Sequence, residues 1–304
     1  MASDPASRAL LWRRAVLLVV AGVALHLAAP GLVALVGAAP RLGRIRPEWF
    51  ALMAGAEMAS LGGAWALVRI AVPGLGWRLA AASQLAGNSI SRLLPGGAAA
   101  GAAVTYRMWA SAGIAATAAA SGLMVTSVVS SLTLFALPVG ALLVAAGSAP
   151  VPHGLLVVAG GAGATAVALG GFSALVLLND SVAWRVQRLV SFAGHVVSRH
   201  GASPDASGGW LAQREEVRSL LGRRWRNALA AAVINWGFDI AALVLALAAV
   251  GSRPHVSLVV LAYVAGAVLG MIPVTPGGLG FVEAGLLGGL GLAGVATPQA
   301  VIAV

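Results

Sequence analysis

The sequence has no cysteine and no lysine, and only 9% of its 304 residues carry a charge. Without cysteine, the chain can form no disulfide, no thiol nucleophile and no thiolate-ligated metal site. A soluble globular domain has about 25% charged residues, so this chain has too few to cover a surface that faces water. Hydrophobic residues make up 60% of it, and the mean hydropathy is +0.93. These values exclude a soluble globular protein and indicate that lipid is its main solvent.

Motifs of soluble enzymes are also absent. We find no Gly-x-Ser-x-Gly, no His-Glu-x-x-His and no nucleotide-binding Gly-Lys-Ser/Thr. The five histidines are scattered without the spacing of metal ligands. We therefore expect no metal and no cofactor, and the sequence leaves catalytic activity open while favouring a protein that is not an enzyme.

Long apolar runs dominate what is present. Five of them, at residues 11–37, 49–72, 113–147, 154–178 and 227–250, have the length of a membrane-spanning helix. We predict an all-α polytopic integral membrane protein with about six to seven spans, formed by a single transmembrane domain over residues 1–304. The first run is too long for a signal peptide and is interpreted as a retained span. Pro138 predicts a kink or break in the third run.

Two other apolar regions are divided into half-length pieces. Residues 79–94 and 98–112 flank Leu94-Pro95-Gly96-Gly97, and residues 257–272 and 279–292 flank Pro276-Gly277-Gly278. A helix of about 15 residues is ~22 Å long, too short for ~30 Å of hydrocarbon. Each pair is therefore predicted to form a re-entrant hairpin, because non-helical backbone at membrane depth must be covered by protein or line a wet cavity. The alternative is two ordinary loops between separate spans.

Arginines set the predicted orientation. The net charge of +10 favours anionic lipid head groups as partners over nucleic acid. Residues 179–226 contain eight arginines and the flexible piece Gly201–Gly209, preceded by either an interfacial amphipathic helix or an ordinary connector. The positive-inside rule places this Arg-rich loop and the N-terminus in the cytoplasm, although the short loop with Arg41, Arg44 and Arg46 would then lie outside. In this topology the two hairpins enter from opposite faces, which is typical of an inverted repeat with a substrate site near the midplane. The chain ends at Val304, a few residues into what we expect to be a further span.

Charged residues within the apolar runs are candidates for function, because they are costly in lipid unless paired or wet. Arg92 and Arg107 flank the first break and could bind a phosphate, or they could extend to the interface. Glu283 begins the last half-helix and could contact a ligand or only cap the helix. Asp239 and Glu57 could line the cavity or serve as structural partners of arginines.

Several of these segments resemble the flippase-like transmembrane domain family of lysylphosphatidylglycerol synthases. The resemblance is most specific at Ile272-Pro273-Val274-Thr275-Pro276-Gly277-Gly278-Leu279-Gly280-Phe281-Val282-Glu283-Ala284-Gly285. Asn88, Leu94-Pro95-Gly96-Gly97, Tyr106-Arg107, Asn235-Trp236 and Asp239 also fit the family pattern. Membership implies a lipid-translocating membrane domain with two re-entrant hairpins. Nothing in the chain corresponds to the cytosolic aminoacyl-transferase domain, so synthase activity is not implied.

Together these observations lead to a hypothesis of lipid translocation in the plasma membrane, acting on an anionic or aminoacylated phospholipid or a polyprenyl-linked lipid. The expected lipid-binding residues are Asn88, Arg92, Pro95, Gly96, Gly97, Tyr106, Arg107, Asn235, Asp239, Pro276, Gly277, Gly278 and Glu283. A membrane transferase or its subunit acting on lipid-linked donors, and a non-catalytic membrane scaffold, are the alternatives. The oligomeric state is left open.

Overall fold

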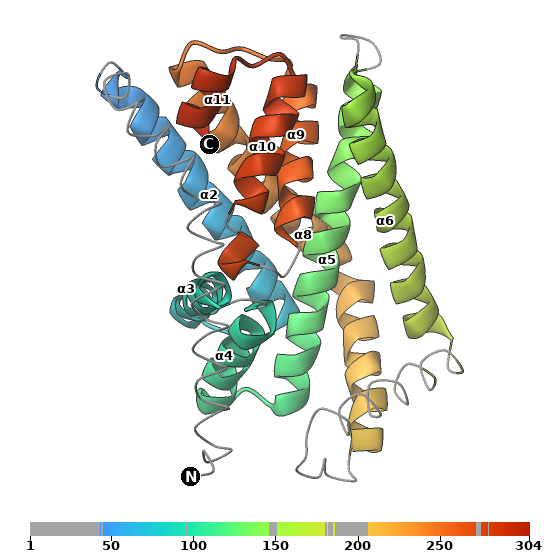
Figure 1. The fold of residues 1–304 in the computed structure, drawn as a ribbon. Helices are drawn as coiled ribbons and strands as arrows, with labels where there is room; N and C mark the ends of the chain where they lie inside the picture. Colours follow the sequence, from blue (N-terminus) through green and yellow to red (C-terminus); the bar gives the residue numbers. More distant parts are fainter. Residues whose placement is uncertain are drawn as a thin grey trace, which may run out of the picture.

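The computed structural model is all-α over the residues that it describes, which are 45–94, 97–145, 151–179, 206–271, 275–278 and 280–304 together with residues 43, 181 and 185. Its elements are α2 (Pro47–Ala71), α3 (Trp77–Leu93), α4 (Ala98–Ser111), α5 (Ala116–Ala145), α6 (His153–Leu178), α8 (Ala206–Ala249), α9 (Val256–Gly270), η1 (Pro276–Gly278), α10 (Phe281–Leu292) and α11 (Thr297–Ala303). Below, the lower end of the molecule is the one where α2 ends and α5 begins, and the upper end is the one where α5 ends and α9 begins (Figure 1).

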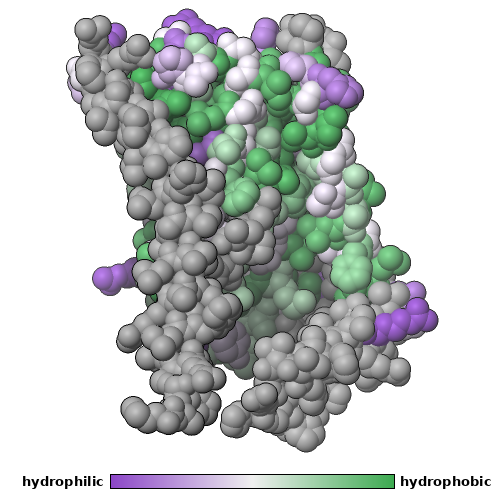
Figure 2. All heavy atoms as spheres, viewed as in Figure 1, coloured by the Kyte–Doolittle hydropathy of each residue, from purple (hydrophilic) through white to green (hydrophobic). Residues whose placement is uncertain are grey.

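Four of the described helices are long and apolar enough to cross a membrane: α2, α5, α6 and the part of α8 from Arg224 to Ala249. Their outward side chains are apolar as well. Leu143 on α5 and Val167 on α6 are each 76% exposed, and Figure 2 shows apolar residues over much of the described flank. Such a surface is compatible with lipid and not with water, which confirms the prediction of a polytopic membrane protein.

The two broken regions form helical hairpins that enter from opposite ends (Figure 1). α3 and α4 have 17 and 14 residues and occupy the lower half, whereas α9 and α10 have 15 and 12 residues and occupy the upper half. None of these helices is longer than about 26 Å at 1.5 Å per residue, so none crosses ~30 Å of hydrocarbon alone. The predicted hairpins and their inverted arrangement are thus confirmed, with α2 preceding one hairpin and α8 the other.

Glycines let the arms of each hairpin pack closely. In the second hairpin, a Cβ at Gly285 would lie 2.7 Å from the Gly266 Cα, and one at Gly289 would lie 2.7 Å from the Ala262 Cα. In the first hairpin, Gly87 and Gly101 face each other in the same way. Helices in lipid associate mainly through such close van der Waals packing, because lipid chains supply no hydrophobic drive.

The long helices α2 and α8 also cross in close contact, at Gly63 of α2. A Cβ at Gly63 would lie 2.6 Å from the Asn235 backbone nitrogen and 2.9 Å from the Ala231 carbonyl oxygen. One turn away, the Asn235 side-chain amide donates to the Ser60 carbonyl oxygen at 3.1 Å and to the Ser60 hydroxyl oxygen at 3.0 Å. This crossing therefore fixes the two helices that precede the hairpins against each other.

Two features differ from the sequence prediction. α8 begins at Ala206, so Ala206–Gly209 is helical instead of flexible, and the 21 residues before the expected span belong to the same helix. The strong helix formers that follow extend the helix backwards, and Val217 packs against Ala71 and Val125. Of the kink or break expected at Pro138, the break is absent: α5 runs through Pro138 as one helix, because the groups that a proline frees inside a membrane helix can be satisfied locally.

Other expectations fall outside the described residues. These are the first span at 11–37, most of the amphipathic segment at 179–200, and Pro95 and Gly96 of the first break.

Close packing at Gly63 predicts a specific effect of added volume. Gly63→Ala should lower the stability of the folded protein by about 1–3 kcal/mol, because the methyl group forces α2 and α8 apart. Gly62→Ala is the matched control, since a Cβ there meets no atom within 4 Å. Thermal unfolding in detergent, followed by size-exclusion fluorescence, should show a lower melting temperature for Gly63→Ala only; equal values for the two variants would contradict the close crossing.

Candidate functional site

The second break meets the end of α3, which is the first arm of the other hairpin. η1 of the second hairpin lies against the end of α3, and a Cβ at Gly277 would lie 3.0 Å from the Arg92 Cα and 3.1 Å from the Arg92 Cβ. Gly277 and Gly278 also adopt positive φ angles of 61° and 72°, which glycine reaches without strain. Glycine is therefore needed here both for the turn and for the close approach of the two tips.

A charged cluster surrounds this meeting point. Glu57 of α2 lies close enough to Arg92 and to Asp239 of α8 for their charges to interact. On the other side, the Tyr263 hydroxyl of α9 donates a hydrogen bond to the Asp239 carboxylate. The antiparallel α2–α8 crossing and the two hairpins thus bring two carboxylates, a guanidinium and a phenol together near the middle of the bundle.

Tyr263 is held in place by α5 and α8. The ring of Trp236 meets the Tyr263 ring edge to face, with centroids 6.1 Å apart and planes at 69°. The Trp236 indole N–H in turn donates to the Ser130 carbonyl oxygen at 3.0 Å and to the Ser130 hydroxyl oxygen at 3.2 Å. These contacts orient the Tyr263 hydroxyl toward Asp239.

A polar pocket of about 180 Å³ lies along the first hairpin where it faces α5. Its polar lining residues are Gln84, Asn88, Ser91, Thr105, Thr126 and Ser127. Trp109 closes the pocket at its lower end and is fully buried, with its indole N–H donating to the Ser83 hydroxyl at 2.9 Å. Asn88 and Arg92 are four residues apart on α3, so they share one face and connect the pocket with the charged cluster.

The other predicted residues of the first hairpin lie elsewhere. Arg107 follows the start of α4 by nine residues, which is about 14 Å along the helix, and it is exposed. At 100° per residue it lies about 200° around α4 from the pocket-lining Thr105. Tyr106 packs partly buried against the apolar cluster around Val72 and Trp109. The structure therefore does not bring Arg107 together with Arg92.

Glu283 caps the last half-helix. Its carboxylate accepts a hydrogen bond of 2.6 Å from the Gly280 backbone N–H, and Gly280 has a positive φ of 85°. This is the helix-capping role that the sequence analysis left open, and the negative charge at the N-terminus of α10 is favourable. Pro276 forms the first residue of η1, and Gly97 packs beneath the Leu94 carbonyl oxygen, where a Cβ would lie 2.7 Å away.

Three residues of this region are not among the lipid-binding residues predicted from the sequence: Glu57, Tyr263 and Ser60. Glu57 and Tyr263 stand out as polar residues in apolar helices, which is a usable signal, but only the fold shows that they meet Asp239. Among the described residues, no three histidine, aspartate or glutamate side chains come together in a way that would hold a metal ion.

Comparison with known families adds to this picture. The family model described as "Lysylphosphatidylglycerol synthase TM region" matches residues 14–304, nearly the entire chain. The chain belongs to this family. The match confirms the resemblance seen in the two hairpins and covers every element described above. No curated protein and no solved structure matches the chain.

Capping by Glu283 predicts different effects for two substitutions in this family member. Glu283→Ala removes both the acceptor and the charge and should lower stability by about 1 kcal/mol. Glu283→Gln keeps an acceptor for the Gly280 N–H and should lose less than half of that. Thermal unfolding in detergent distinguishes the two variants, and equal loss in both would contradict a role that depends on the hydrogen bond.

Proposed function

We propose that the protein moves a lipid between the two membrane leaflets, at the site where the hairpin tips meet. The substrate class is an anionic or aminoacylated phospholipid or a polyprenyl-linked lipid. The observation that carries this proposal is the contact of two broken hairpins from opposite ends beside Arg92, with a polar pocket leading to it. Discontinuous helices that meet near the midplane are typical of sites that open alternately to the two sides. The family match supports a membrane role of this kind.

In this proposal Arg92 holds the lipid phosphate. A guanidinium offers a planar fork of donors that suits phosphate oxygens, and Asn88 on the same face adds an amide donor. Arg107, exposed near the lower end, is proposed to attract the head group from the adjacent leaflet. The phosphate would then move along the first hairpin from Arg107 towards Arg92.

The carboxylates are proposed to line the opposite half of the site. Asp239 and Glu57 lie across from the tip of the first hairpin and would favour an amine on an aminoacylated head group. Glu283 at the start of α10 is proposed to belong to this acidic side as well, in addition to capping the helix. A single site of this kind can contact a zwitterionic or aminoacylated head group through both of its charges.

The distribution of described arginines supports an orientation in the plasma membrane. Arg69, Arg78, Arg107, Arg224 and Arg226 belong to the lower end, whereas only Arg46 and Arg253 belong to the upper end. By the positive-inside rule, we propose that the lower end and the Arg-rich loop at residues 179–226 are cytoplasmic.

Translocation in proteoliposomes tests the function directly. Wild-type protein should let a membrane-impermeant quencher remove more than the outer-leaflet share of a head-group-labelled anionic phospholipid signal after incubation. Arg92→Ala should slow this transfer about tenfold or more, because a charge-assisted hydrogen bond contributes roughly 1.5–3 kcal/mol. Arg78→Ala is the matched control, since Arg78 is an exposed arginine on the same helix but at its other end.

Quenching that stays at the outer-leaflet fraction for anionic, aminoacylated and polyprenyl-linked lipids would remove the proposed function. Equal slowing by Arg92→Ala and Arg78→Ala would instead contradict the proposed binding of the lipid phosphate by Arg92.

Because the chain has no cysteine, its orientation can be tested with single introduced thiols. Ala112→Cys lies after α4 at the lower end and Ala296→Cys before α11 at the upper end, and both positions are exposed. A membrane-impermeant maleimide should label Ala296→Cys in intact spheroplasts and Ala112→Cys only after permeabilisation. The reverse pattern would place the Arg-rich segment outside.

A further inference from the structure

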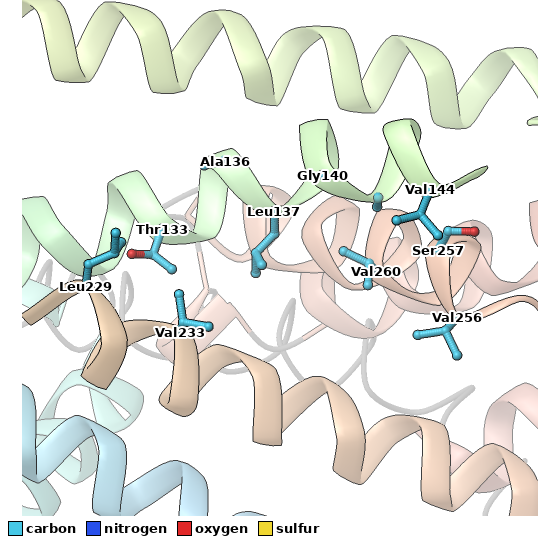
Figure 3. A pocket seen from close by; sticks show the side chains of 11 residues that line it. Thr133, Ala136, Leu137, Gly140, Val144, Leu229, Val233, Val256, Ser257 and Val260 are labelled. Carbon is cyan, nitrogen blue, oxygen red and sulfur yellow. The ribbon is translucent and has the colours of Figure 1, made fainter. Parts of the chain in front are cut away.

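An apolar groove runs along the bundle between α5, α8 and α9, from Leu229 and Thr133 at one end to Val256 and Ser257 at the upper end (Figure 3). Its volume is about 500 Å³. Among its lining residues are Leu137, Gly140 and Val144 from α5, Leu229 and Val233 from α8, and Val260 from α9. It is separate from the polar pocket, which lies along α3 and α4 and shares no residue with it.

The groove has the length and chemistry of a hydrocarbon-chain site. From Thr133 to Val144 the α5 wall extends for eleven residues, or about 16 Å. Thr133 and Ser257 are the only hydroxyl residues in the lining, and the Thr133 hydroxyl is already donated to the Val129 carbonyl oxygen of its own helix at 2.8 Å. The lining is therefore apolar apart from the Ser257 hydroxyl, and an extended acyl chain suits the groove.

Arg253 lies near the upper end of the groove, in an adjoining pocket. Val256 lines both the groove and an adjoining pocket of about 330 Å³, whose lining includes Arg253 and Trp49. Tryptophan is enriched where membrane meets water, so this pocket has the character of a head-group region. Arg253 is exposed and forms no ion pair or hydrogen bond with any described residue. The upper end has one other described arginine, Arg46, which is paired with Glu48 at 2.9 Å.

We propose that this groove and Arg253 form a binding site for an anionic phospholipid of the upper leaflet. The phosphate lies at Arg253 beside Trp49, and one acyl chain follows the groove down towards Leu229 and Thr133. We assign a phosphate to this place by charge complementarity, because Arg253 is the cation at this end that has no partner among the described residues. The first turn of α9 begins beside it without a side-chain cap, which further favours negative charge.

The experiment uses the full chain in phosphatidylcholine vesicles that contain a phosphatidylglycerol probe with a diazirine at the end of one acyl chain. After illumination, the expected label lies in residues 133–137 or 229–233, at the deep end of the groove. Excess unlabelled phosphatidylglycerol should remove the label, and the phosphatidylcholine analogue of the probe should label less.

Two pairs of variants test the head-group and chain contacts separately. Arg253→Gln should reduce labelling roughly fivefold, since one arginine near a membrane surface contributes about that factor, while Arg46→Gln should not. Gly140→Leu should abolish labelling by filling the groove, while Gly160→Leu on α6 should not. Both glycines are exposed helical positions where a Cβ meets no atom within 4 Å, so neither change is expected to disturb the fold.

Equal labelling in Gly140→Leu and Gly160→Leu, or equal labelling by the two lipid analogues, would overturn the proposal. Crosslinks through residues 133–144 to a second copy of the chain would also overturn it, since the groove would then be a protein interface. Because labelling reports binding alone, a chain that binds lipid here but does not translocate it would leave this site standing and remove only the proposed function.

Discussion

The architecture depends on one constraint: backbone polar groups that a broken helix exposes inside a membrane must be covered by protein or reach water. Each hairpin breaks near the middle of the bundle, and the described backbone of the second break lies against the end of α3. Gly277 permits that contact, because any side chain there would collide with Arg92. The second break therefore lies against the first hairpin, and the candidate site and the fold share Gly277 and Arg92.

The α2–α8 crossing holds this arrangement together. Gly63 lets the two helices touch backbone to backbone, and Asn235 locks their register by two hydrogen bonds to Ser60. With that register fixed, Glu57 and Asp239 fall opposite each other one turn away. Close packing, which is the main source of helix association in lipid, thus also decides which charges meet.

The sequence was sufficient for the features that local chemistry controls. Half-length apolar pieces around Pro-Gly-Gly breaks predicted both hairpins. The length of an apolar run and the breaking of a helix by glycine and proline are both local properties of the sequence. It was insufficient where distant segments meet. No local pattern shows that Glu57 lies beside Asp239, or that Arg107 turns away from the pocket that Thr105 lines. The early start of α8 was missed because the glycine-rich composition of 201–209 indicated a linker, whereas the helix-forming run after it extends the helix to Ala206.

In the proposed function, the charges of the central cluster bear on how a lipid leaves the site as well as on how it enters. A lone guanidinium in a low-dielectric site would bind phosphate tightly and would itself be costly to hold there. Glu57 lies close enough to lower the positive potential at Arg92, although the two side chains form no ion pair. The Asp239 carboxylate accepts a hydrogen bond from the Tyr263 hydroxyl, so it has fewer free acceptor positions for Arg92. In the proposed function, these opposing charges keep the binding of a phosphate from becoming too strong, as a site that passes a head group on requires.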